Sequence, residues 1–171
     1  MKDISPLKEW DVSNVMDMAC MFESCASLTD ISALLEWNTL NVHDTTAAFD
    51  HTEVSSDILD AFVPMACPRE GAFIGYKKCR GGQIVQLEVQ EDAKRSSAHT
   101  RKCRCSKAKV LNIWTRYGDE TEIAVSCFDN SFVYRKGETV EVEDFDDDRF
   151  IECSSGIHFF MTREEAEAYT L

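Results

Sequence analysis

The stretch I-S-P-L-K-E-W at residues 4–10 returns as I-S-A-L-L-E-W at residues 31–37, an offset of 27. The same offset carries further identities: Asn14-Val15 onto Asn41-Val42, Asp17 onto Asp44, and Phe22 onto Phe49. Matches among tryptophan, asparagine and phenylalanine at one offset indicate an internal repeat. The matching positions read I-S-x-L-x-E-W, then N-V-x-D, then F.

A period of 27 residues is typical of leucine-rich repeats, in which each unit forms one turn of a solenoid. The apolar side chains of one turn stack on those of the next and build a continuous core. We therefore expect Trp10 and Trp37 to be core residues. Two turns alone are marginal, so we expect the rest of the chain to support them.

The residues W-D-V-S-N-V-x-D-M-x-x-M-F-x-x-C, from Trp10 to Cys25, resemble the BspA-type leucine-rich repeats of bacterial surface proteins and mycoplasma lipoproteins. The resemblance covers about residues 1–52, and the second copy departs further from the pattern. It implies a binding scaffold without catalysis. The surface location usual in that family is not expected here, because no export signal is visible.

Length and composition restrict the class of protein. The chain has 171 residues, of which 44% are hydrophobic and 29% charged, which is typical of a folded domain, with or without a small appendage. No apolar run approaches the roughly 20 residues that a membrane span needs. The N-terminus lacks the apolar stretch of a signal peptide. These features exclude transmembrane, signal-secreted and collagen-like proteins, and we expect a cytoplasmic location in a bacterial host.

The charge changes sign along the chain. Residues 1–66 hold 2 basic and 12 acidic side chains, residues 67–115 hold 11 and 4, and residues 116–171 hold 5 and 15, for a total of −13. The basic middle can pair with the acidic flanks, or it can form an exposed cationic patch. The overall acidity argues against direct DNA binding. An acidic surface can instead occupy the basic groove of a nucleic-acid-binding partner.

The chain contains eight cysteines at positions 20, 25, 67, 79, 103, 105, 127 and 153. Without a signal peptide we expect free and mostly buried thiols in a reducing compartment. Cys103-Arg104-Cys105 is a C-x-C pair, but the second short-spaced pair that a zinc site usually needs is missing. We predict no metal and no cofactor.

Strand patterns dominate after Pro64, Pro68 and Gly71. We therefore predict two domains: residues 1–66, with two repeats and a connector, and residues 67–171. About six strands are expected, near residues 72–77, 84–89, 108–115, 123–128, 131–134 and 139–142. Thr162-Arg163-Glu164-Glu165 is a capping box that opens a C-terminal helix. The predicted fold class is α+β: a short leucine-rich-repeat solenoid followed by a strand-rich domain with a C-terminal helix.

Three strings in the second half carry another resemblance: Gly75 to Cys79, Ala93 to Arg104, and Cys153 to Ala166 with its C-x-x-G-I-H-F-F signature. They resemble a domain found in phage and prophage proteins, often behind repeats. The resemblance covers about residues 67–171. It implies a phage or mobile-element context, and it implies no reaction, because no activity is established for that family.

Cys153 and His158 are the weak catalytic candidates. They lie five residues apart, and a turn at Gly156 could bring them within the hydrogen-bond reach that a Cys–His nucleophile pair needs. The favoured interpretation is a turn before a buried strand, with His158 hydrogen-bonded in the core. The P-loop, Rossmann, G-x-S-x-G and H-E-x-x-H patterns are absent, so we expect a protein that is not an enzyme.

The basic middle could bind phosphate. Residues 96–100 are expected to form a flexible loop, and flanking arginines can hold phosphate in a bidentate manner. The candidate residues are Lys94, Arg95, Arg101, Lys102 and Arg104. In the alternative interpretation, this segment pairs with the acidic run at residues 141–148. That run lacks the register of an EF-hand loop.

The favoured function is a non-enzymatic phage or prophage protein that binds a host protein, such as a nuclease that binds nucleic acid. Masking such a defence factor would be an anti-CRISPR-like role. The acidic residues expected to bind the partner are Glu141, Glu143, Asp144, Asp146, Asp147 and Asp148. Two alternatives are a phosphate- or nucleotide-binding domain or enzyme that uses the basic cluster and His158, and a structural component of a phage particle. No membrane contact is expected, and the oligomeric state is left open.

Overall fold

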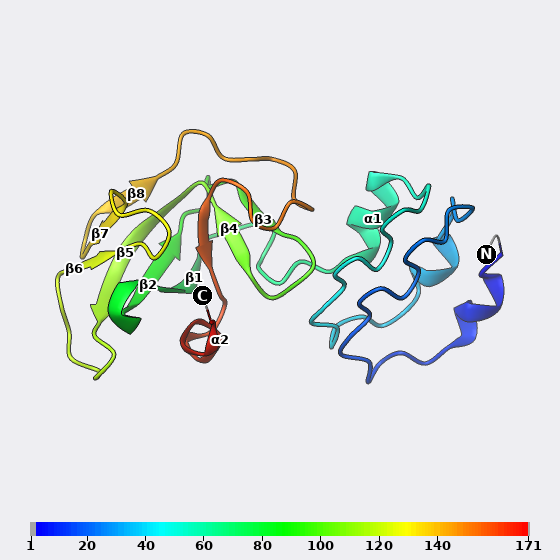
Figure 1. Cartoon of the computed structure of the whole chain (residues 1–171), viewed down its shortest axis with the longest axis horizontal. Helices are drawn as coiled ribbons and strands as arrows, with labels where there is room; N and C mark the ends of the chain where they lie inside the picture. Colours follow the sequence, from blue (N-terminus) through cyan, green and yellow to red (C-terminus); the bar gives the residue numbers. More distant parts are fainter. Residues whose placement is uncertain (1–2, 171) are drawn as a thin grey trace. The chain divides into compact units, whose positions relative to one another are not determined.

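A computed structural model describes residues 3–170 of the chain (Figure 1). The chain divides into two compact units, Met1–Met65 and Ala66–Leu171. This division lies one residue from the boundary expected between residues 66 and 67. Each unit has buried apolar side chains of its own, so we describe each by itself.

The first unit has little regular secondary structure. It contains two short 3-10 helices, η1 (Ser5–Glu9) and η2 (Ser32–Leu34), and one α-helix, α1 (Ser56–Phe62). The two 3-10 helices begin 27 residues apart, as the repeat requires. In both copies an aspartate side chain accepts a hydrogen bond from the main-chain nitrogen of the helix's first serine, at 2.9 Å in the first copy and 2.8 Å in the second.

The two repeat copies lie against each other with equivalent residues in contact. The rings of Phe22 and Phe49 stack at 5.5 Å between centroids, and those of Trp10 and Trp37 stack at 6.4 Å. A main-chain ladder joins the copies, with N–H groups of Met18, Cys20, Phe22 and Ser24 donating to carbonyls of Asp44, Thr46, Ala48 and Asp50. The repeat of the sequence is therefore also a repeat of the structure, in which equivalent rings stack and main-chain hydrogen bonds join the two copies.

Helix α1 covers the second copy. The ring of its last residue, Phe62, lies 6.3 Å from Trp37 and 5.3 Å from Phe49. Trp37 is consequently sandwiched and buried, as expected. Trp10 is 55% exposed, which corrects the prediction that both tryptophans are core residues. The reason is positional: Trp10 stacks on Trp37 by one face, and among residues 3–170 no third copy covers its other face.

The second unit is a strand-rich α+β structure with a C-terminal helix, which confirms that part of the predicted fold class. Within residues 3–170 it has nine strands rather than about six. They are β1 (Phe73–Lys78), β2 (Ile84–Val89), β3 (Arg95–Ser97), β4 (Cys103–Cys105), β5 (Lys107–Trp114), β6 (Ile123–Val125), β7 (Val133–Arg135), β8 (Thr139–Glu141) and β9 (Ile157–Phe159). A short 3-10 helix, η3 (Arg80–Gly82), joins β1 to β2.

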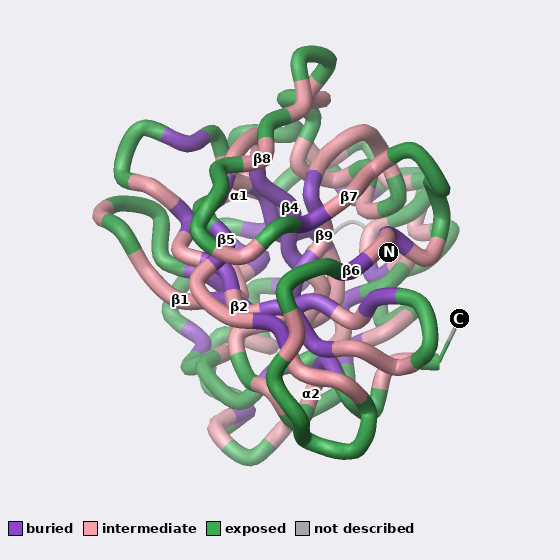
Figure 2. Tube along the Cα trace, turned by 90° about the vertical axis from the view of Figure 1, so that its left-hand side faces the viewer, coloured by how far each residue is buried: buried purple, intermediate pink, exposed green. Residues whose placement is uncertain are grey.

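The strands form three antiparallel sheets. Their orders are β1-β2-β5-β8, β3-β4-β9 and β6-β7. Tyr76 of β1 and Phe160, just after β9, exchange main-chain hydrogen bonds of 2.8 Å, which join the edges of the two larger sheets. In Figure 2 buried residues run along β2, β4 and β9, where the core of this unit lies.

Helix α2 (Arg163–Ala168) begins at the predicted capping box. The hydroxyl of Thr162 accepts a hydrogen bond from the main-chain nitrogen of Glu165 at 3.2 Å, and the Glu165 carboxylate accepts one from the nitrogen of Thr162 at 3.1 Å. Two of the helix's unpaired N–H groups are satisfied in this way. The helix lies beside β1 (Figure 1).

The segment around residues 96–100 is not the flexible loop that we expected. Ser96 and Ser97 belong to β3 and are buried, and Ala98 is buried as well. β3 pairs with β4, and β4 pairs in turn with β9, which lies more than fifty residues further along the chain. Strands of three residues show too little alternation to be predicted from sequence, so their pairing with neighbouring strands defines them.

Candidate functional site

The second unit contains a cavity of about 790 Å³, within the range of small-molecule pockets. Six parts of the unit form its walls: the end of β1, the residue before β4, the β6–β7 hairpin, the end of β8 with the segment after it, the residues around β9, and the residue after α2. The lining residues are Lys77, Lys78, Lys102, Ser126, Phe128, Asp129, Phe132, Tyr134, Glu141, Val142, Asp144, Cys153–His158, Phe160 and Tyr169. Sequence segments that are distant along the chain therefore meet at one concave site.

Lys77 is the unusual side chain of this pocket. Gly75 and Lys77 occupy the inward positions of β1, so the alternation of the strand turns the lysine into the protein, where it is only 7% exposed. Its Nζ donates to the main-chain oxygen of His158 at 3.0 Å and lies 5.9 Å from the ring centroid of Tyr134. Burial lowers the pKa of Lys77, because apolar surroundings disfavour the ammonium form.

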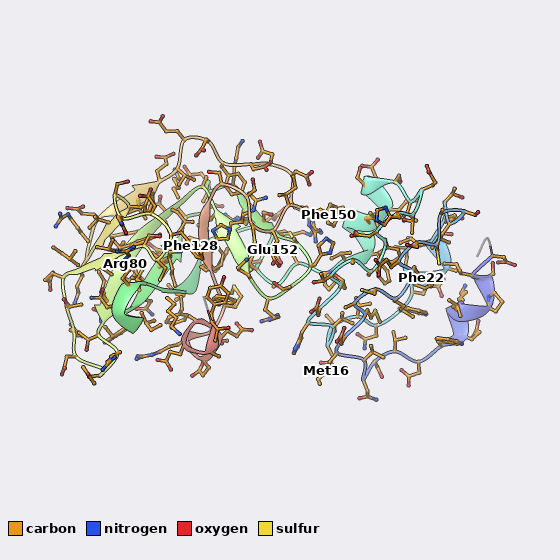
Figure 3. The ribbon with its side chains drawn as sticks, viewed as in Figure 1. Met16, Phe22, Arg80, Phe128, Phe150 and Glu152 are labelled. Atoms are coloured by element: carbon orange, nitrogen blue, oxygen red, sulfur yellow. The ribbon has the colours of Figure 1, made fainter. Side chains whose placement is uncertain are left out.

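Aromatic rings supply most of the apolar wall. Phe132 lies 5.3 Å from Tyr134, and Phe160 lies 5.2 Å from Tyr169, between ring centroids. Phe128, in the loop between β6 and β7, is 75% exposed although it lines the cavity (Figure 3). Such rings can hold a flat apolar molecule by stacking and by edge contacts.

The structure places Cys153 and His158 in the same pocket, with their polar groups engaged elsewhere. The imidazole Nε2 of His158 lies 3.1 Å from the main-chain oxygen of Glu152, which can only accept, so Nε2 carries the proton. Burial, with nearby Lys77, lowers the pKa of His158 to about 4. Cys153 is exposed, and its Sγ accepts from Lys102 Nζ at 3.2 Å.

Among residues 3–170 no hydrogen bond joins the Cys153 thiol to the His158 ring. The histidine follows the favoured interpretation of the sequence: it lies on a strand and is hydrogen-bonded to main chain. A Cys–His nucleophile pair needs direct contact between the thiol and the base, and this geometry does not supply it.

Two of the three arginines in the predicted phosphate cluster bind main-chain carbonyls. The Arg95 guanidinium donates to the oxygens of Gly71, Gln90, Glu91 and Ala93 at 2.6–3.1 Å. Arg104 is buried at 1% exposure, and its guanidinium donates to the oxygens of Asp146, Asp148 and Ser155. This corrects the expectation of flanking arginines that present their guanidinium groups on a loop.

The remaining members of that cluster have acidic partners. Arg101 Nε pairs with Glu165 at 2.8 Å, Lys94 Nζ pairs with Asp147 at 2.7 Å, and Lys102 Nζ lies 3.5 Å from Glu152. Each of these basic residues is thus engaged within the protein. Pairing with the acidic run applies to Lys94, through Asp147, and to Arg104, through the main-chain oxygens of Asp146 and Asp148, whereas Glu152 and Glu165 lie outside that run.

The acidic run at residues 141–148 begins in β8 and continues as a loop around Arg104. Asp144 accepts from the Ser155 hydroxyl at 2.8 Å, and Asp146 accepts from the nitrogen of Asp148 at 2.9 Å. Both interactions stabilise the loop itself. Asp147 and Glu143 are exposed, and Glu141 lines the cavity opposite the basic side chains. Of the residues expected to bind a partner, Asp144 and Asp146 thus accept hydrogen bonds from within their own loop.

All eight cysteines are free thiols, and four of them, Cys67, Cys79, Cys103 and Cys105, are buried. The thiols of Cys67 and Cys103 are hydrogen-bonded to each other, which lowers the pKa of Cys67 and raises that of Cys103. Between residues 3 and 170 no three His, Cys, Asp or Glu side chains converge as metal ligands. None of the helices in this range has the length and hydrophobicity of a bilayer-spanning segment.

The first unit exposes an unusual number of large apolar side chains for its size. Leu40 is 86% exposed, and Met16, which lies at the edge of the unit in Figure 3, is 62% exposed. The others are Trp10, Met21 and Leu35. They occur in a segment of charge −10. Exposed apolar side chains can supply contact area for a protein partner.

The comparisons with known proteins agree with the two units. Residues 63–166 match the model of a family of unknown function, DUF5758. The chain belongs to this family. Residues 2–62 match the model of a mycoplasma protein of unknown function, DUF285. No curated protein and no solved structure matches the chain significantly.

The sequence did not predict Lys77 as a site residue, and it did not predict most of the aromatic residues that line the pocket. The segment Phe73-Ile74-Gly75-Tyr76-Lys77 alternates, and Lys77 falls on the face of Phe73 and Gly75. A lysine in phase with the inward face of a strand was the signal that could have revealed it. Phe128, Phe132 and Tyr169 carry no such signal, because only the tertiary fold brings the hairpin and the C-terminal segment together.

Proposed function

We propose that this protein is a non-enzymatic binding protein whose first unit recognises another protein. The unit is, in this proposal, a short BspA-type leucine-rich-repeat coil. The partner is a basic, nucleic-acid-binding protein of a bacterial host, such as a defence nuclease, and the chain has a phage or prophage origin. The role would be to mask the partner's nucleic-acid groove.

One observation carries this proposal: the first unit combines exposed apolar side chains with a net charge of −10. Leu40 and Met16 would offer apolar contact area, and the net negative charge of the unit would select a partner of opposite charge. Acidic residues 141–148 support it less, because Asp144, Asp146 and Asp148 bond within their own loop. The structure thus favours the first unit over the acidic run as the contact surface.

The test is affinity capture from bacterial lysate at low and high salt, with the tagged chain and a Leu40→Asp/Met16→Asp variant. We expect one stoichiometric, basic, nucleic-acid-binding partner that is displaced by heparin and by salt. The double variant should lose it, while an Ile123→Asp control in the second unit should retain it. Equal capture by the double variant would refute the proposed surface, and an acidic partner would refute the masking role.

A second candidate function is the binding of a small molecule by the second unit. The cavity of about 790 Å³ favours it. The sequence alternative of a phosphate or nucleotide on the basic cluster loses support from the geometry, because Arg95 and Arg104 bind carbonyls. In this proposal the binding site is the pocket, which His158 and Lys102 line and which neither arginine lines.

A thermal-shift screen tests this second function, since a ligand that binds only the native state raises the unfolding temperature. A Val142→Phe variant places a larger side chain in the pocket wall and should abolish any shift. A Val133→Phe variant outside the lining is the control. If no aromatic, anionic or nucleotide probe shifts the unfolding temperature at millimolar concentration, the pocket is not a binding site.

A further inference from the structure

Lys77 is a buried amine whose hydrogen-bonding capacity is largely unused. An ammonium group has three donors, and the interactions described within residues 3–170 use one, to the oxygen of His158. No carboxylate in this range forms an ion pair with it; nearby groups are the Tyr134 ring, the thiols of Cys79, Cys105 and Cys127, and the Lys102 ammonium. A buried amine without a carboxylate is costly unless a partner completes it.

The other lysines of the pocket are already paired. Lys78 Nζ donates to the oxygens of Glu167 and Tyr169, both at 2.8 Å. Lys102 Nζ contacts Cys153 and Glu152. Of the three pocket lysines, Lys77 therefore has the most unused donors, two against one each for Lys78 and Lys102.

We propose that the pocket selects a small organic carboxylate with a flat apolar body, and that Lys77 is the group that recognises the carboxylate. This inference rests on the ligand-binding function proposed above. The carboxylate would take the free donors of Lys77, and the aromatic wall of Phe128, Phe132, Phe160 and Tyr169 would hold the apolar body. Burial lowers the pKa of Lys77, and a bound carboxylate would oppose this shift, because an opposite charge nearby favours the ammonium form.

Two features disfavour a phosphate or nucleotide in this site. A phosphate is usually held by several donors from arginines, main-chain N–H groups or a helix N-terminus, and no arginine is among the residues that line this cavity. In addition, Asp129, Glu141 and Asp144 line the same cavity. They would repel a polyanion more strongly than a molecule with a single negative charge.

The test uses two probes of the same shape on the full-length protein: 2-naphthoate, which is anionic, and 2-naphthamide, which is neutral. Binding is measured by calorimetry and by probe fluorescence. We expect naphthoate to bind at least about tenfold more tightly than naphthamide, the effect of one buried charged hydrogen bond. Lys77→Met should remove this preference and leave naphthamide binding unchanged, and Lys94→Met, an exposed lysine, should preserve it.

The outcomes separate this inference from the general function of the pocket. Equal affinities for the two probes in the wild-type protein would overturn recognition by Lys77 while the pocket remains a binding site. If a folded Lys77→Met protein still binds both probes with the wild-type affinities, recognition of the carboxylate by Lys77 is overturned as well. If neither probe binds, and Val142→Phe does not change the thermal shift caused by any other probe, both the inference and the ligand-binding function fail. The wild-type comparison needs no variant, so a misfolded Lys77→Met protein does not prevent the test.

Discussion

Gly75 lacks a side chain at the point where β1 passes the ring of Phe159. A Cβ at this position would lie 2.6 Å from the Phe159 Cδ2 atom, well inside van der Waals contact. We predict that Gly75→Ala destabilises the second unit by about 2 kcal/mol, the usual cost of overpacking a filled core. Urea unfolding followed by tryptophan fluorescence measures this loss.

A double variant provides the control for this prediction. Phe159→Leu removes part of the ring that the new methyl group would meet, so Gly75→Ala should cost less in that background. If Gly75→Ala costs the same with leucine as with phenylalanine at position 159, or costs nothing, then contact with the Phe159 ring is not the reason for glycine.

His158 makes stability depend on pH. Its pKa is lowered to about 4 in the folded protein, first by burial and then by Lys77, against about 6.5 in an unfolded chain. Between these values the unfolded state binds more protons, so stability rises with pH. The contribution of His158 is complete above about pH 6.5 and is lost as the pH falls toward 4, by about 3 kcal/mol in all.

The measurement is the free energy of unfolding at several pH values for the wild-type protein and for His158→Gln. The variant should be less dependent on pH between about 4 and 6.5, because it lacks the titrating ring. Identical pH profiles would contradict the assignment. Replacement of His99, another histidine of the same unit, is the matched control.

At the scale of elements, the loop that begins with the acidic run depends on Arg104 of β4. The guanidinium donates to Asp146 at 2.6 Å, to Ser155 at 3.0 Å and also to Asp148, and it lies 5.0 Å from the Phe145 ring centroid. Gly156 lies close enough that a Cβ there would be 3.0 Å from the Arg104 Cβ. One buried side chain thus organises a loop that has little secondary structure of its own.

We predict that Arg104→Met loosens residues 144–156 and destabilises the unit by about 3 kcal/mol, because three carbonyls lose a charged donor. Hydrogen exchange should increase throughout this loop. Lys94→Met, which removes an exposed ion pair with Asp147, should cost at most about 0.5 kcal/mol. Unchanged protection of the loop in Arg104→Met would contradict this role.

At the scale of the whole molecule, each unit forms its secondary structure from its own residues. All nine strands and helix α2 lie between residues 73 and 168, and every strand pairing is internal to the second unit. We predict that a fragment of residues 66–171 folds alone with a cooperative transition. Far-UV circular dichroism and thermal unfolding measure this, and a non-cooperative melt would show that it needs the first unit.

The parts of the fold that sequence reasoning predicted are those with a local signal. The strand at residues 84–89 was predicted with its observed bounds because Val85, Leu87 and Val89 alternate. The capping box at Thr162 was predicted because its two hydrogen bonds join residues three apart. The strands β3 and β4 were missed, since each is three residues long, and β4 is held between β3 and the distant strand β9.

The sequence alone identifies the repeat and its aromatic positions, because residues that lie 27 positions apart occupy equivalent places in the two copies. Tertiary structure decided the rest. It exposed Trp10 and buried Trp37, since only one of them is covered on both faces. It also buried Arg104, and it brought Lys77 and Tyr134 into one cavity, because burial and proximity depend on which distant segments pack together.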